Sequence, residues 1–168
     1  LGLGVDIVLG TGWPYGGPQV EREFAATKLV VQKYELKQGE VFDQELKPDA
    51  KERQPASLSA VLAYDTKGNF KDLTSDVTEN KLKWTAQDAA YTVYALFTGK
   101  TGQQVKRAAP GGAGYTLDHY SQEAFEDYVQ PYDTAFAEIQ GHLRAIFNDS
   151  YEVYGTDFTP KFFEFFKQ

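Results

Sequence analysis

The sequence predicts an α/β fold in which short parallel strands are interrupted by an inserted antiparallel β subdomain. Three observations support this prediction. The chain opens on an apolar run bounded by glycines, its middle alternates polar and apolar residues with a period of two, and its last third returns to strand–helix alternation. We therefore expect residues 1–27 and 108–168 to form one α/β unit and residues 28–107 to form a β-rich insertion.

The first predicted element is a strand over residues 3–9, LGVDIVL, because a nearly continuous apolar run is typical of a strand covered on both faces. The loop GTGWPYGGPQV follows at residues 10–20, since its glycines and prolines favour turns. This loop contains Trp13 and Tyr15, which cannot both be core residues of a regular element. A short helix is expected at Glu21–Ala26.

The middle of the chain predicts antiparallel strands, because its segments alternate in polarity, are rich in β-branched and aromatic residues, and lack helical spacing. Turn signals such as DTKGN at residues 65–69 separate them. The strand-like segments are KLVVQKYEL (28–36), ASLSAVLAYD (56–65), KLKWTA (81–86) and AYTVYALFTG (90–99).

The last third predicts a strand, a helix, a strand and a helix. A short strand at residues 115–117 precedes a helix capped by Ser121, whose apolar residues up to Ile139 fall at helical spacing. A buried strand at residues 143–147 follows. The final helix has Thr159 as its N-cap and Pro160 in its first position, and we expect its phenylalanines to be mostly core residues. They are Phe162, Phe163, Phe165 and Phe166.

Composition restricts the possible partners. The net charge of −7 argues against nucleic acid and against an anionic membrane surface, because both are polyanions. Aromatic residues make up 15% of the chain, and the flat faces of Tyr and Trp suit stacking on sugars. The absence of Cys excludes disulfides, thiolate zinc ligands and thiol nucleophiles.

Polar residues follow three of the predicted parallel strands, at the edge where reactive groups of α/β folds gather. They are the loop with Trp13 and Tyr15, the segment Asp118-His119-Tyr120, and residues 148–152. Each has a plainer explanation, since Asp118 can cap a helix, His119 can be structural, and Asp149 and Ser150 can form a turn. Their joint occurrence favours a site.

Motifs for other chemistries are absent from the sequence: it has no GxSxG elbow, no phosphate-binding loop ending in Lys-Ser or Lys-Thr, and no HExxH. Carboxylates and aromatics remain, and carbohydrate chemistry uses both.

Three blocks resemble glycoside hydrolase family 106, the α-L-rhamnosidases of bacteria that degrade plant polysaccharides. They are GLGVDIVLGTGWPYGGPQV, RAAPGGAGYTLDHYS and LRAIFNDSYEVYGTDFTPKFFEFFK. The resemblance implies a (β/α)8 TIM barrel with β subdomains, so we expect this chain to be part of such a barrel. It also implies inverting hydrolysis of terminal α-L-rhamnosyl residues in oligo- or polysaccharides, assistance by calcium, and a periplasmic or extracellular location in a bacterium.

The resemblance assigns the general acid to Glu152, and aromatic neighbours at Tyr151, Tyr154 and Phe147 are expected to surround it. Asp149 is expected to help bind calcium or sugar hydroxyls. The expected substrate-binding residues are Trp13, Tyr15, Asp118, His119 and Tyr151.

The general base of the family is expected on a later strand, beyond Gln168, so we expect the 168 residues to be a fragment that is inactive alone. Two other classes stay open. A non-catalytic carbohydrate-binding module would use the same aromatics only to hold a sugar, and a structural interaction domain would use none of them.

Overall fold

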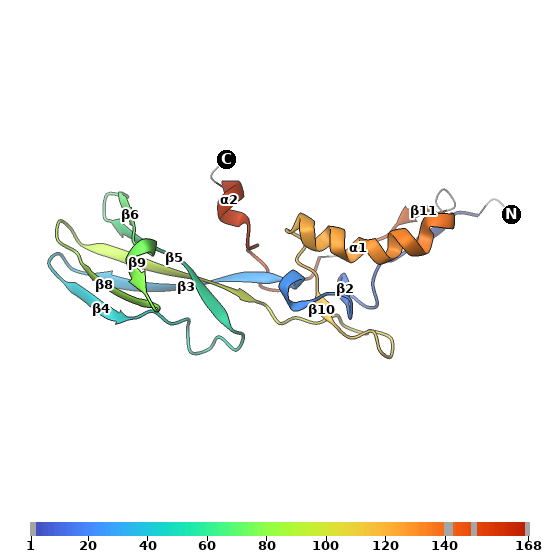
Figure 1. Cartoon of the computed structure of the whole chain (residues 1–168), viewed down its shortest axis with the longest axis horizontal. Helices are drawn as coiled ribbons and strands as arrows, with labels where there is room; N and C mark the ends of the chain where they lie inside the picture. The colour runs from blue at the N-terminus through green and yellow to red at the C-terminus, as the bar shows by residue number, and fades with distance from the viewer. Residues whose placement is uncertain (1–2, 140–142, 149–150, 167–168) are drawn as a thin grey trace. The chain divides into compact units, whose positions relative to one another are not determined.

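The computed structural model describes residues 3–139, 143–148 and 151–166 (Figure 1). The chain divides into two compact units. The first unit combines Leu1–Lys28 with Lys100–Gln168, and the second consists of Leu29–Gly99. No helix in the described ranges is long and apolar enough to cross a bilayer.

The second unit is built from two antiparallel β systems. A four-stranded sheet has the order β3 (Thr27–Leu36), β9 (Tyr91–Lys100), β5 (Ala56–Asp65) and β6 (Phe70–Asp72), and β5 runs antiparallel to both β9 and β6. A three-stranded sheet has the order β4 (Val41–Glu45), β8 (Lys81–Thr85) and β7 (Val77–Thr78), again with antiparallel pairs. A single 3-10 turn, η2 (Thr74–Asp76), precedes β7.

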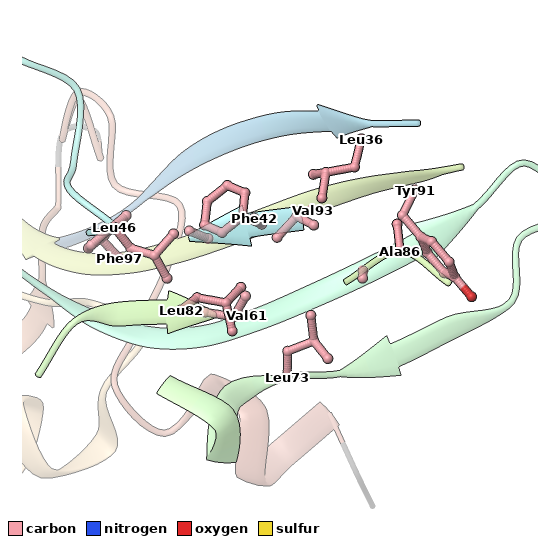
Figure 2. Close-up of a cluster of buried hydrophobic side chains, with 12 residues drawn as sticks. Leu36, Phe42, Leu46, Val61, Leu73, Leu82, Ala86, Tyr91, Val93 and Phe97 are labelled. Atoms are coloured by element: carbon pink, nitrogen blue, oxygen red, sulfur yellow. The ribbon is translucent and has the colours of Figure 1, made fainter. Parts of the chain in front are cut away.

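The core of this unit contains side chains from both sheets, and Figure 2 shows them gathered between the strands. Phe42 of β4 and Leu82 of β8 come from one sheet, while Val61 of β5 and Val93 of β9 come from the other. Buried and half-buried residues alternate along the whole of β9. Alternate residues of a strand face opposite sides of the sheet, so this burial confirms the strand that the period-two pattern of the sequence predicts.

The described residues of the first unit form two small sheets. β1 (Val5–Ile7) pairs in parallel with β11 (Leu143–Ile146), and β2 (Gly16–Gly17) pairs antiparallel with β10 (Tyr115–Thr116). The helical elements are η1 (Arg22–Phe24), α1 (Gln122–Phe136), η3 (Ala137–Ile139) and α2 (Phe162–Phe166).

Helix α1 carries the main apolar contact of the first unit. It begins as the sequence predicts, because the Ser121 side chain accepts a hydrogen bond from the Ala124 amide at 3.2 Å. Ala124 and Tyr128 are fully buried and pack in one cluster with Leu9, Val20 and Leu117. The helix thereby holds the loop after β1 and the end of β10 in one core.

The prediction of an α/β fold forming part of a (β/α)8 barrel is wrong for this chain. The structure is mostly β-sheet, with two α-helices in the described residues. β1 and β11 do pair in parallel, but β10, which was expected as a parallel strand, pairs antiparallel with Gly16 and Gly17. The reason is local: an added Cβ at Gly16 would overlap the Tyr115 carbonyl oxygen, so only glycine permits this close backbone pairing.

The expected burial of the outer apolar segments is also wrong. Val8 is 53% exposed, because side chains alternate along the strand and only Ile7 and Leu9 face the cluster with α1. Ile146 and Phe147, expected in a buried strand, are both more than half exposed. Within the described part of the chain, β1 and β11 form a sheet of only two strands. Much of the surface of so small a sheet stays open to solvent. The α2 side chains Phe162, Phe165 and Phe166 are exposed as well, and Phe163 is half-buried.

Candidate functional site

A cavity of about 350 Å³ lies in the first unit, and half of its lining residues carry aromatic rings. It brings together the loop after β1, the residues after β10, the start of α1 and the segment after residue 150. The side chains that matter below are Tyr15, His119, Tyr120, Phe125 and Tyr151. This volume falls at the small end of the range of ligand pockets in proteins, so it suits a ligand of about one sugar ring.

Tyr15 forms one wall of the cavity. Its hydroxyl donates a hydrogen bond to the Phe147 carbonyl at 2.8 Å, and its ring stacks on that of buried Tyr128 with 6.1 Å between centroids. Burial raises the pKa of the Tyr15 phenol, so the group stays protonated at neutral pH. Tyr15 is thus held as a fixed surface that connects β11 to α1.

His119 lies between two phenol rings. Its centroid is 4.3 Å from that of Tyr120 and 5.2 Å from that of Tyr151. Burial lowers the pKa of the imidazole, while the nearby Asp118 carboxyl opposes the shift. The ring is therefore neutral at pH 7. Its Nδ1 is buried and has no hydrogen-bond partner among the described residues, so it offers a polar atom within an aromatic setting.

Asp118 is not among the lining residues of the cavity, although its chain neighbours Leu117 and His119 are. The side chain is 1% exposed, and its Oδ1 accepts a hydrogen bond from the Tyr120 amide at 3.1 Å. Its Oδ2 has no hydrogen-bond partner by geometry within the described ranges. Burial raises the pKa of Asp118, and the Lys100 ammonium opposes that rise. Asp118 is therefore placed to support its neighbours Leu117 and His119, which line the cavity.

Lys100 provides a half-buried positive charge near Asp118. Its ammonium donates to the carbonyls of Glu23 at 2.7 Å and Ala25 at 3.0 Å, and to the Thr27 hydroxyl at 3.0 Å. Burial lowers the pKa of Lys100. The three bonds join the chain around η1 to the end of β9.

Glu152 is exposed and is not part of the cavity lining, although its neighbours Tyr151 and Val153 are. Its carboxylate Oε2 accepts a hydrogen bond from the Tyr154 hydroxyl at 2.8 Å. The expected apolar enclosure is absent from the described residues, since Tyr151, Tyr154 and Phe147 are all more than half exposed. Glu152 thus lies at the edge of the cavity with a defined partner.

Trp13 does not line the cavity either. Its backbone pairs with that of Lys106 through bonds of 3.1 and 2.7 Å, and the Lys106 ammonium lies 5.3 Å from the Trp13 ring centroid. The same ammonium lies 5.0 Å from the Tyr154 ring. Trp13 therefore contacts the Glu152 segment through Lys106.

Asp149, the expected calcium ligand, lies outside the described residues. Across the ranges that the structure describes, no group of three or more His, Asp or Glu side chains is arranged to hold a metal ion. Calcium binding stays a prediction.

Two residues of the site were missed by sequence reasoning. Phe125 was assigned to the apolar face of α1, but it is 50% exposed and lines the cavity. Gln103 was placed in the β-rich insertion, yet its side chain bonds to the Glu152 segment. Helical spacing indicated that Phe125 lies on the apolar face of α1, but not that its ring lines the cavity. No pattern in the sequence marked Gln103.

Two of the comparisons with known proteins found a match. A family model described as alpha-L-rhamnosidase matches residues 31–168. The solved structure of a rhamnosidase from Novosphingobium sp. PP1Y is similar with a TM-score of 0.71 at 15% identity, which shows a shared fold. The match covers 98% of this chain and 33% of that one, so the chain spans about a third of that relative. No curated protein matches. Because the family model covers most of the sequence, the chain belongs to glycoside hydrolase family 106.

Proposed function

We propose that this protein contributes to an inverting glycoside hydrolase that removes terminal α-L-rhamnosyl residues from plant glycosides or polysaccharides. The observation that supports this most is the aromatic cavity beside Glu152 in a chain of this family. A 6-deoxy sugar presents a methyl group and apolar ring faces, which suit the rings of Tyr15, His119 and Tyr151.

In this proposal Glu152 is the general acid that protonates the departing glycosidic oxygen. An inverting enzyme pairs such an acid with a second carboxylate about 6.5–9.5 Å away that activates water. The proposal assigns that base to a part of the enzyme outside these 168 residues. Tyr15 and Tyr151 hold the sugar, and neutral His119 supplies a hydrogen-bonding atom among the rings.

Replacing Glu152 by Gln in the full-length protein tests the assignment. We expect kcat on a natural rhamnoside to fall by about 10²–10⁴-fold, because a positioned acid contributes that much. An aryl rhamnoside should lose less, since a good leaving group needs less protonation. Retention of most activity on both substrates would remove Glu152 from the role.

A carbohydrate-binding function without catalysis is the second candidate. The finding that favours it is the exposed position of Glu152, outside the aromatic lining. Calorimetry with rhamnose and a hydrolysis assay on the full-length protein separate the two. Binding without turnover would support the binding function, and turnover that depends on Glu152 would support the enzyme.

A further inference from the structure

The side chain of Gln103 joins the backbone on both sides of Glu152 to the rest of the first unit. Its amide nitrogen donates to the Glu152 carbonyl at 2.9 Å, and its amide oxygen accepts from the Tyr154 amide at 2.7 Å. A primary amide that donates to one peptide group and accepts from another imitates one rung of a β-ladder. The orientation of residues 152–154 is therefore tied to one side chain.

Gln103 is itself firmly held. Its backbone N–H donates to the Thr101 hydroxyl at 3.2 Å. Its backbone carbonyl accepts from both the backbone N–H and the hydroxyl of Thr116, at 3.1 and 3.3 Å. Thr116 is fully buried in β10, directly before the segment that carries Asp118 and His119. Gln103 thus connects the backbone of Glu152 to β10, the strand that leads into Asp118 and His119.

The Glu152 carboxylate is oriented by a second contact. The Tyr154 hydroxyl donates to Oε2 at 2.8 Å, and the Tyr154 ring lies against the Lys106 ammonium, which also faces Trp13. Residues 103 and 106 lie in the same connection between β9 and β10. This connection thereby holds the backbone of Glu152 through Gln103 and its carboxylate through Tyr154.

We propose that Gln103 is a positioning residue for Glu152. The inference rests on the proposed role of Glu152 as general acid. Residues 151–154 belong to no helix or strand, so without Gln103 their direction depends on short local contacts such as the Val153 to Tyr151 backbone bond. An acid must be placed to within a fraction of an ångström of the leaving oxygen, and a shift of about 1 Å costs about 10²-fold in rate.

The test replaces Gln103 by Ala in the full-length protein, with Gln104→Ala as the matched control. Gln104 is the adjacent, exposed residue of the same type, and none of the side-chain bonds described above involves it. We expect Gln103→Ala to lower kcat on a natural rhamnoside by about 10–10²-fold with KM little changed. An aryl rhamnoside should lose severalfold less, whereas Gln104→Ala should leave both rates near wild type.

Selectivity for the leaving group separates positioning from general damage. A merely structural loss lowers both substrates equally, and such a result would overturn the inference. Gln103→Glu keeps the acceptor for the Tyr154 amide but replaces the donor by a carboxylate oxygen that repels the Glu152 carbonyl, so we expect the same selective loss on the natural substrate. If Gln103→Ala does not fold, Gln103→Glu takes its place, because it is close in size to Gln and removes only the donor to the Glu152 carbonyl; an equal loss on both substrates would again overturn the inference.

The Glu152→Gln background distinguishes failure of this inference from failure of the proposed function. With Glu152 absent, adding Gln103→Ala should cause no further loss on the natural substrate. A further tenfold loss would overturn the positioning role while leaving Glu152 as the acid. An active Glu152→Gln enzyme would overturn the proposed function itself, and the positioning role with it.

Discussion

The rings of His119 and Tyr151 lie 5.2 Å apart between centroids and are tilted by 31°. His119 follows β10 and Tyr151 follows β11, which belong to two different sheets of the first unit. Both rings line the cavity, and their contact connects the residues after β10 to the segment that carries Glu152. The lining of the cavity therefore includes a contact between two short segments that are far apart in the sequence.

Replacing Tyr151 by Ala should weaken binding of a rhamnoside. The change removes both a wall of the cavity and the ring that holds His119, and an aromatic contact of this kind contributes about 0.5–1.5 kcal/mol. We expect the dissociation constant to rise by about 2–10-fold, measured by calorimetry on the full-length protein. Tyr151→Phe is the control, because it keeps the ring and should bind within about twofold of wild type. Equal affinity for the Ala variant would place the sugar elsewhere.

Replacing Gly16 by Ala should destabilise the first unit. The added Cβ would overlap the Tyr115 carbonyl oxygen and approach Val105 Cγ1 to 2.8 Å, so β2 and β10 could not pair as they do. We expect a loss of about 3 kcal/mol and a melting temperature lower by about 6–12 °C, followed by circular dichroism.

Gly39→Ala is the matched control for this change. Gly39 has a φ of 82° but no neighbour within 4 Å of an added Cβ, so only backbone strain of about 1 kcal/mol is expected. If both variants melted together, the close contact between β2 and β10 would not be a determinant of stability.

Asp118 should make the stability of the protein fall as pH rises above about 4. Burial raises its folded-state pKa above the ordinary value of 3.8, so the folded protein keeps this proton after the unfolded chain has lost it. The stabilising contribution is complete below 3.8 and is lost as pH rises through the raised folded value.

Asp118→Asn should remove this part of the pH dependence, because Asn keeps an oxygen for the Tyr120 amide and does not titrate. Urea unfolding between about pH 4 and pH 7 measures the difference from wild type. Asp65→Asn is the control of opposite sign. Hydrogen bonds from Asn69 lower the pKa of Asp65, so its contribution is present above 3.8 and lost as pH falls. Parallel curves for wild type and Asp118→Asn would contradict the expectation.

Local features of the fold were predictable wherever neighbouring residues decide them. The strands β5 and β9 match the predicted segments closely, because period-two alternation reports one buried face directly. The Ser121 cap was predictable for the same reason, since a cap depends on a residue and the amide three positions later. The resemblance of three sequence blocks also indicated the family correctly.

Burial was harder to predict than secondary structure. The apolar runs at residues 3–9 and 143–147 do form parallel strands, but Val8 and Phe147 are more than half exposed. An apolar run shows that a segment can be buried. Whether it is buried depends on which other elements pack against it. Helix α1 covers only the side with Ile7 and Leu9.

The sequence by itself determined the local elements, the antiparallel character of the middle segments, the family, and the polar segments that meet at the cavity. Only the tertiary structure decided that β10 pairs with Gly16 and Gly17, that Asp118 is buried outside the cavity lining, and that Gln103 bonds to the Glu152 segment. The physical reason is range. Periodicity and capping arise between residues a few positions apart, but these contacts join residues about 50 to 100 positions apart, and no local pattern specifies such partners.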